Sequence, residues 1–118
     1  NKLIIGLPGN PVSALVCCQV MVKPVIEKML GLKENSNGLK LFAKLKTKLS
    51  ENGEREHYLR AILKQENEYQ IVNPVFNQDS SLLSELVKSN SLIKRTPFAP
   101  AVNAGKIIEV LPLFTKFD

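Results

Sequence analysis

Two prolines enclose a glycine and an asparagine near the start of the chain, in the order Pro8-Gly9-Asn10-Pro11. This spacing predicts a tight turn followed by a helix, because Asn is a favoured helix N-cap and Pro suits the first helical position. The first amides of a helix lack intrahelical partners and carry the positive end of its dipole, which favours bound anions. The turn therefore predicts part of an oxyanion site, with a well-capped helix as the plain structural alternative.

Two further positions carry side chains that suit oxyanion chemistry. Arg60 stands between Leu59 and Ala61, where a guanidinium needs either a ligand or a path to the surface. Ser80 lies in the segment 78–81 (Gln-Asp-Ser-Ser), directly before a helical pattern. Its hydroxyl either caps that helix or faces an anion. From the residues alone, both alternatives stay open at each position.

The other reactive side chains form no recognised catalytic pattern. Cys17 and Cys18 are neighbours in a predicted helix, where side chains diverge by about 100°, so we expect no disulfide between them. His57 is the single histidine, and the sequence holds no zinc-like spacing, Ser-His-Asp set, phosphate-binding loop or dinucleotide fingerprint. We therefore expect free thiols, a reducing compartment and no metal ligands within the chain.

The composition is that of an ordinary globular protein of 118 residues, with 44% hydrophobic and 23% charged side chains, which excludes intrinsic disorder. The formal charge of +5 allows an anionic ligand or nucleic acid and decides between neither. No apolar run is long enough to cross a bilayer, and no secretory leader pattern is present. We expect a cytoplasmic protein without membrane contact.

The elements that must position these residues fall into two parts, of which the first is a strand and a helix. Residues 2–6 are predicted as a buried strand, and residues 11–30 as a long helix that is apolar around much of its circumference. Pro24 lies inside the helix and removes one backbone hydrogen bond, so a kink or restart is expected there. Gly31 is predicted to end the helix, and the polar segment 33–38 to be a linker.

From residue 39 onward the pattern changes to short strands. Residues 39–49 alternate with period two, and Asn52-Gly53 then gives a strong hairpin signal. Further strands are predicted at 55–63, 69–74, 91–96 and 106–111, with one short helix at 82–89. The expected fold class is α+β: the strand and helix that end an α/β domain, then a small C-terminal antiparallel β-barrel with one short helix.

The nine residues 6–14 (Gly-Leu-Pro-Gly-Asn-Pro-Val-Ser-Ala) resemble the signature of the molybdopterin molybdenumtransferases. That family includes bacterial enzymes of molybdenum-cofactor synthesis and the C-terminal part of gephyrin. The resemblance continues in order and covers essentially the whole chain, through residues 55–63, 78–81, 89–93 and 104–110. Because the first residue is not Met and a buried type of strand starts at once, we expect the C-terminal piece of a longer protein.

The resemblance implies an activity and a layout. The family inserts molybdate into adenylylated molybdopterin, with a divalent cation such as Mg²⁺, and releases AMP. It implies that residues 1–32 end the α/β molybdopterin-binding domain, residues 33–38 form the linker and residues 39–118 form the barrel domain. It also implies a homodimer, an active cleft between the α/β domain and the barrel, and small-molecule substrates rather than nucleic acid.

The resemblance also assigns roles to the residues of the first turn. Pro8 and Pro11 match prolines that line the family's cleft, and Gly9 and Asn10 lie between them. These four residues are therefore the expected substrate-binding residues of the chain.

In the barrel, Arg60 matches an arginine that faces the oxyanion, and Ser80 matches the serine of a Gln-Gly-Ser segment. These two are the expected catalytic residues. Asp79 replaces the family's glycine, and its carboxylate repels a nearby anion unless it points away or is paired. The family's acidic catalytic residues and the ligands of its divalent cation lie outside this chain, so the chain alone is expected to be inactive.

Two alternatives belong to other classes of function. Four lysines share one face of the first barrel strand and suit a basic nucleic-acid-binding barrel: Lys40, Lys44, Lys46 and Lys48. Only Phe42 interleaves with them, whereas single-strand binders offer several stacking aromatics, and a solvated strand face is the plain alternative. The other alternative is a protein-interaction module that binds a partner through the loop 97–100 (Pro-Phe-Ala-Pro).

Overall fold

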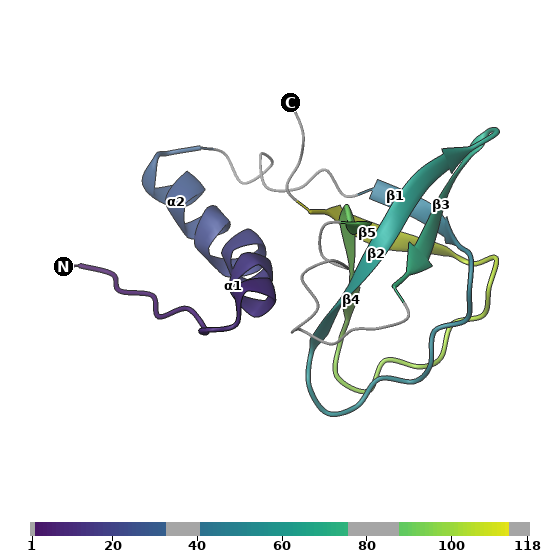
Figure 1. Ribbon diagram of the computed structural model, residues 1–118, viewed down its shortest axis with the longest axis horizontal. Helices are drawn as coiled ribbons and strands as arrows, with labels where there is room; N and C mark the ends of the chain where they lie inside the picture. The colour runs from purple at the N-terminus through teal and green to yellow at the C-terminus, as the bar shows by residue number, and fades with distance from the viewer. Residues whose placement is uncertain (1, 33–40, 76–87, 114–118) are drawn as a thin grey trace.

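Among the described residues, five short strands close into a barrel, and a helical arm lies beside it (Figure 1). The computed structural model describes residues 2–32, 41–75 and 88–113. The strands are β1 Leu41–Leu45, β2 His57–Glu66, β3 Tyr69–Pro74, β4 Ser91–Arg95 and β5 Ile107–Pro112. Their order around the barrel is β1-β3-β2-β4-β5. A helical start followed by a small β-barrel confirms the expected fold class.

The barrel core is made by every second residue of its strands. Ala43 and Leu45 of β1 lie inside together with Ala61, Val72 and Val110, and each of these side chains is at most 2% exposed. Successive side chains of a strand point to opposite faces, so one set fills the interior while the other faces out. This packing confirms the period-two prediction for the first barrel strand.

Barrel closure departs from the antiparallel expectation at one pair of strands. β1 and β3 are parallel, with Lys44 opposite Ile71, whereas the other neighbouring pairs of described strands are antiparallel. The hairpin predicted at Asn52-Gly53 is wrong, because β1 and β2 are not neighbours. Placing β1 between β3 and β5 pairs both of its edges and closes the barrel, which a local hairpin with β2 does not achieve.

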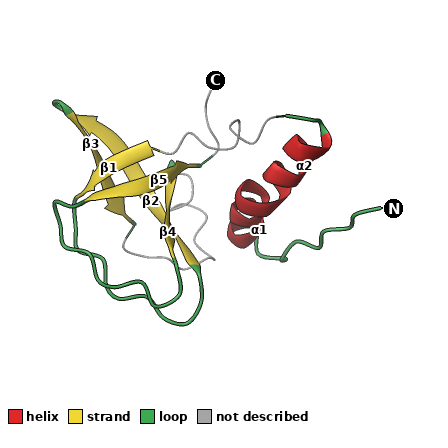
Figure 2. Cartoon of the chain, turned by 180° about the vertical axis from the view of Figure 1, so that it is seen from behind, coloured by secondary structure: helices red, strands yellow, loops and turns green. Residues whose placement is uncertain are grey.

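Two long connections run side by side at one end of the barrel, as both views show (Figures 1 and 2). Residues 46–56 link β1 to β2, and residues 96–106 link β4 to β5; we call them the paired loops. Leu49 and Val102 form an antiparallel bridge between them, with each backbone N–H donating to the other's carbonyl at 2.9 and 3.0 Å. The paired loops therefore form a second, smaller strand-like contact beyond the barrel.

The predicted long helix forms in three consecutive parts: α1 Pro11–Cys17, the π-helical turn η1 Cys18–Val22 and α2 Lys23–Met29. The π-helical turn lies directly before Pro24. Pro24 has no N–H, and the wider turn lets the N–H of Lys23 donate to the carbonyl of Cys18, five residues back. The restart predicted at Pro24 is confirmed. Cys17 and Cys18 are free thiols, as predicted.

The end of α2 is a Schellman motif around Gly31, which has φ 76°. The N–H of Gly31 donates to the carbonyl of Lys28, and the N–H of Leu32 donates to that of Glu27, both at 3.0 Å. A positive φ costs glycine little because it has no Cβ. The prediction that Gly31 ends the helix is confirmed.

Residues 2–6, predicted as a strand, form no strand in this structure. Leu3 and Ile4 are 64% and 89% exposed, and the segment extends away from the barrel on the far side of the helical arm (Figure 2). A strand needs a neighbour for its backbone hydrogen bonds, and no described strand pairs with this segment. An exposed apolar run of this kind is typical of a surface that another element covers.

Several sequence predictions fall on residues that the structure does not describe. The linker 33–38 lies outside the described residues, and of the short helix 82–89 only Lys88 and Ser89 are described. The division into domains at residues 32 and 39 therefore stays a prediction. In the described part of the chain, no helix has the length and apolarity needed to span a membrane.

Candidate functional site

The first turn of α1 is capped as the sequence predicts. The Oδ1 atom of Asn10 accepts hydrogen bonds from the N–H groups of Val12 at 3.0 Å and Ser13 at 3.2 Å. Its backbone carbonyl accepts from the N–H of Ala14 at 2.9 Å, and Pro11 takes the first helical position. The turn thus satisfies the first free amides of the helix by itself.

This cap changes the oxyanion site that the turn was expected to form. Pro11 has no N–H, and Asn10 already occupies the amides of Val12 and Ser13, so the helix end itself offers an anion few donors. Among the described residues, the backbone N–H groups of Gly9 and Asn10 make no hydrogen bond. An anion that approaches the turn meets these two amides and the positive end of the helix dipole.

Arg60 is buried in the outer wall of the barrel, with 4% of its surface exposed. Its direct partner across the β2–β4 pair is Leu92, and residues directly opposite in an antiparallel pair share a face. Leu92 belongs to one apolar cluster with Val12 of α1. Arg60 therefore lies on the barrel face against which the first turn of α1 packs, and the alternative of a surface arginine is wrong.

The contact between the helical arm and the barrel is apolar; we call it the seam. Its buried members are Val12, Leu92 and Leu113, and partly buried neighbours are Val16, Val20, Tyr58 and Leu111. Fully burying one such side chain stabilises the folded state by about 1.5–3 kcal/mol, so the seam holds the arm in place. Figure 1 shows α1 beside β4. The structure thus brings the capped turn and Arg60, which are distant in sequence, to one seam.

Ser80 and Asp79 lie outside the described residues, so the predicted role of Ser80 stays a prediction. Both described flanks of that segment are attached to β2. The N–H of Val75 donates to the carbonyl of Arg60 at 3.0 Å. On the other side, the amide group of Asn90 exchanges two hydrogen bonds with the backbone of Leu63, at 2.7 and 2.9 Å.

Two side chains in a small polar cluster at one margin of the seam, Tyr58 and Lys94, have raised pKa values. Glu56 accepts a hydrogen bond from the hydroxyl of Tyr58 at 3.4 Å and pairs with the Nζ of Lys94 at 3.3 Å. Burial is the main cause that raises the pKa of Tyr58 above its usual 10.0. The hydrogen bond to Glu56 is the main cause that raises the pKa of Lys94.

The described residues do not fit a metal site. Within residues 2–32, 41–75 and 88–113, no three or more His, Cys, Asp or Glu side chains gather where they could hold a metal ion.

Sequence reasoning missed two residues that organise the paired loops, Asn52 and Arg95. The Nδ2 atom of Asn52 donates to the carbonyls of Arg55, Arg95 and Thr96, at 2.9, 3.2 and 2.7 Å. Arg95 is the last residue of β4 and lies on the inward side with Ile93, which is 2% exposed. An arginine at an inward strand position was the signal that could have found it.

The lysine face of the first barrel strand is interrupted in the structure. β1 ends at Leu45, so Lys46 and Lys48 lie in the loop, and Lys40 is outside the described residues. The Nζ atom of Lys44 lies 5.4 Å from the centre of the Tyr69 ring, which is cation–π contact within the chain. A continuous basic strip along one strand is thus not seen among the described lysines.

A closed barrel with the strand order β1-β3-β2-β4-β5 beside a capped helix defines a class of C-terminal domain. Comparison of the chain with known proteins identifies the family. The chain belongs to the family described as "MoeA C-terminal region (domain IV)", whose model matches residues 43–113. The barrel described above lies almost entirely within that range.

Two relatives extend the similarity to the helical arm. The chain is 34% identical over 113 residues to the molybdopterin molybdenumtransferase of Haemophilus influenzae, covering 95% of this chain and 28% of that protein. It is 32% identical over 109 residues to molybdopterin molybdenumtransferase 1 of Mycobacterium tuberculosis, covering 88% and 25%. The chain thus spans about a quarter of the length of these relatives. Neither they nor the matching family support the nucleic-acid or interaction-module alternatives.

Solved structures share the fold. A molybdopterin biosynthesis moeA protein from Pyrococcus horikoshii OT3 superposes with a TM-score of 0.74 at 23% identity, covering 90% of this chain and 26% of that chain. A molybdenum cofactor biosynthesis protein from Pyrococcus furiosus gives a TM-score of 0.72 at 21% identity, covering 90% and 36%.

Proposed function

We propose that this chain acts as the C-terminal part of a molybdopterin molybdenumtransferase. The whole protein would insert molybdate into adenylyl-molybdopterin and release AMP. The observation that carries the proposal is that the capped Pro8–Pro11 turn and the buried Arg60 both adjoin the seam, next to Val12 and Leu92, although Arg60 follows Pro11 by 49 residues. Both elements match motifs of the family to which the chain belongs.

In this proposal the chain contributes charge and shape rather than a nucleophile. The guanidinium of Arg60 donates charge-assisted hydrogen bonds to molybdate or to a phosphate group, and burial strengthens these bonds. The stiff turn, with Pro8, Gly9, Asn10 and Pro11, positions the substrate at the positive end of α1. Ser80 is proposed to add a hydroxyl. Catalysis is then mainly positioning and electrostatic stabilisation.

Other parts of the proposal concern the protein beyond this chain. The acidic catalytic residues and the ligands of a divalent cation such as Mg²⁺ are proposed to lie in the remaining three quarters of the protein. A homodimer, a cytoplasmic location and an inactive isolated chain belong to the same proposal. The exposed apolar residues Leu3 and Ile4 support it, because an α/β domain would cover them.

The test uses the full-length protein that contains this chain, with adenylyl-molybdopterin as substrate and AMP release on addition of molybdate as readout. Arg60→Ala is expected to weaken molybdate binding at least tenfold, since a hydrogen bond to a charged group contributes about 1.5–3 kcal/mol. Arg60→Lys keeps the charge and should bind molybdate with intermediate affinity. The matched control is Arg55→Ala, at an exposed arginine near the start of β2.

Two results would overturn the proposal. One is a folded full-length protein that releases no AMP when molybdate is added. The other is a folded Arg60→Ala protein whose molybdate affinity equals that of the Arg55→Ala control. Circular dichroism of each variant establishes the folded state, because Arg60 is buried and its removal can also affect stability.

A further inference from the structure

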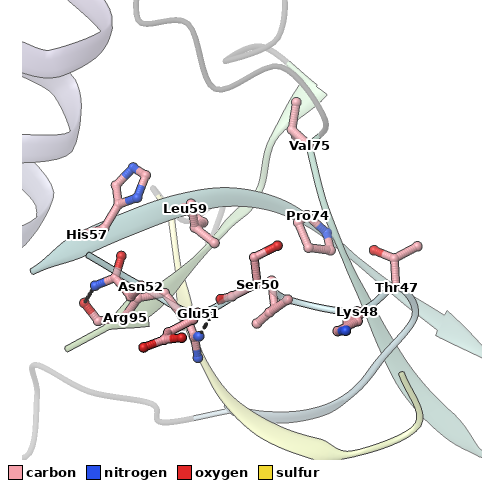
Figure 3. A pocket seen from close by; sticks show the side chains of 11 residues that line it. Thr47, Lys48, Ser50, Glu51, Asn52, His57, Leu59, Pro74, Val75 and Arg95 are labelled. Atoms are coloured by element: carbon pink, nitrogen blue, oxygen red, sulfur yellow. Dashed lines mark hydrogen bonds between the residues drawn. The ribbon is translucent and has the colours of Figure 1, made fainter. Parts of the chain in front are cut away.

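A pocket of about 330 Å³ opens at the end of the barrel that carries the paired loops (Figure 3). Its wall is formed by residues 47–52, by the start of β2, by Pro74 at the end of β3 and Val75 after it, and by Arg95. Small-molecule sites typically enclose roughly 300–1,000 Å³, and the mouths of β-barrels are a frequent place for them. The pocket lies apart from the seam, because none of the seam residues lines it.

Arg95 places a buried charge in this wall, with 7% of its surface exposed. Its hydrogen bonds to described residues all leave from Nη2, toward the carbonyls of Ser50 at 2.8 Å, Ala99 at 3.4 Å and Pro100 at 2.7 Å. The Nε and Nη1 groups therefore donate to no described residue.

The positive charge of Arg95 has no acidic partner within the described part of the chain. The ion pairs there are Lys23 with Glu27 and Lys94 with Glu56, and neither involves Arg95. Burying a guanidinium costs free energy unless a charge or several hydrogen bonds compensate, and three carbonyl contacts at one nitrogen compensate it in part. Neither Nε nor Nη1 of Arg95 is among the buried nitrogens of the described residues that lack a partner, so both are accessible and an anion in the pocket would pair with them.

Arg95 and Lys48 outweigh Glu51, so the described charged side chains that line the pocket carry a net positive charge. His57 is the direct cross-strand partner of Arg95, so both side chains lie on one face. Figure 3 shows these two on one side of the pocket and Thr47 on the other. Lys48 and Glu51 also line it, so two permanent cations face one carboxylate among the described lining residues.

We propose that this barrel-mouth pocket is a second anion site, which binds the oxyanion group of a small molecule through the guanidinium of Arg95. The shared chemistry is a phosphate or carboxylate group, to which arginine donates strong charge-assisted hydrogen bonds. His57 and Lys48 also line the pocket, whereas the hydroxyl of Thr47 donates to the Oδ1 atom of Asn73 at 3.1 Å. Neither the Pro8–Pro11 turn nor Arg60 lines this pocket, so the site is independent of the proposed function.

The experiment is an amide NMR titration of the 118-residue chain with inorganic phosphate and, in a separate arm, with acetate. Sodium chloride at matched ionic strength is the reference. We expect saturable shifts at residues 47–52, His57 and Arg95 in at least one arm, and the arm that responds identifies the group. Shifts that sodium chloride reproduces, or the lack of a saturable shift in both arms, would overturn the proposal.

A variant that avoids the loop contacts of Arg95 gives a second test. Arg95→Ala removes three loop contacts and risks unfolding, whereas His57 is exposed. His57→Glu places a carboxylate beside Arg95, so it should weaken anion binding at least tenfold, while the neutral control His57→Gln retains most of it. Equal affinities for the two His57 variants would contradict an anion site at Arg95.

Discussion

The Nη2 group of Arg95 donates to the carbonyl oxygen of Ser50 over 2.8 Å, and this bond joins the end of β4 to the loop that follows β1. Asn52, in the loop after β1, adds a second connection to the end of β4, because its Nδ2 donates to the carbonyl of Arg95. Two side chains that donate to backbone carbonyls thus hold the paired loops together. The bond to Ser50 also fixes the guanidinium of Arg95 in the wall of the barrel-mouth pocket.

Removing the Asn52 amide should loosen the paired loops. Asn52→Ala loses hydrogen bonds to the carbonyls of Arg55, Arg95 and Thr96, and the free energy of unfolding is expected to fall by about 1–3 kcal/mol. Urea denaturation followed by circular dichroism measures the change. Asn103→Ala, at an exposed position of the other loop, is the control and should be near neutral. Equal midpoints for both variants would contradict the assigned role.

The N-cap of α1 should be measurable in the same way. Asn10→Ala removes the acceptor for the amides of Val12 and Ser13, so the protein should lose about 1 kcal/mol of stability. Asn10→Ser retains a side-chain acceptor and should restore most of the loss. If Ala and Ser variants unfold at the same urea concentration, the cap contributes nothing and the expectation is wrong.

Gly31 should tolerate no side chain without cost, because its φ is 76°. A Cβ at Gly31 would meet no atom within 4 Å, so any effect of Gly31→Ala comes from backbone conformation rather than from a clash. We expect a loss of about 1 kcal/mol, measured by thermal unfolding. Gly53→Ala is the matched control: it also has open space around it, without a positive φ. If Gly53→Ala lost as much stability as Gly31→Ala, the positive φ of Gly31 would be excluded as the cause.

Alkaline pH should destabilise the seam through Tyr58. The pKa of Tyr58 is raised in the folded state, so the unfolded chain releases this proton first as pH rises. The stability contribution is therefore complete below pH 10.0 and is lost as pH rises through the higher folded pKa. Lys94, whose folded pKa is raised above 10.5, acts with the same sign.

Tyr58→Phe separates the two contributions, because it removes the hydroxyl and leaves the Lys94–Glu56 pair in place. Urea midpoints of this variant should fall less steeply above pH 10.0 than those of the unmodified protein, and in parallel with them below it. Identical profiles for both proteins on the alkaline side would show that Tyr58 does not contribute.

Local features of the fold could be predicted from the sequence because their causes lie within a few residues. The cap at Asn10, the restart at Pro24 and the stop at Gly31 each depend on one residue type and its near neighbours. The strand predicted at 69–74 is seen at those bounds as β3, whereas the alternating segment 39–49 forms a strand at Leu41–Leu45.

The candidate site was predicted in part. Motif resemblance pointed to the turn and to Arg60, but the sequence left open whether Arg60 reaches solvent, because burial depends on what packs over a strand. Val12, 48 residues earlier, decides this by packing on Leu92 beside Arg60. In the turn, the side chain of Asn10 accepts hydrogen bonds from the amides of Val12 and Ser13, which the predicted anion site would otherwise have used.

By itself the sequence determined the capped turn, the helix limits, most strand positions and the family. Only the tertiary structure decided that β1 pairs with β5 and β3 rather than with β2, that residues 2–6 stay unpaired, and that Arg95 turns inward. The reason is physical: caps and turns are satisfied by groups nearby in the chain, whereas strand pairing depends on which distant edges closure of the barrel can pair.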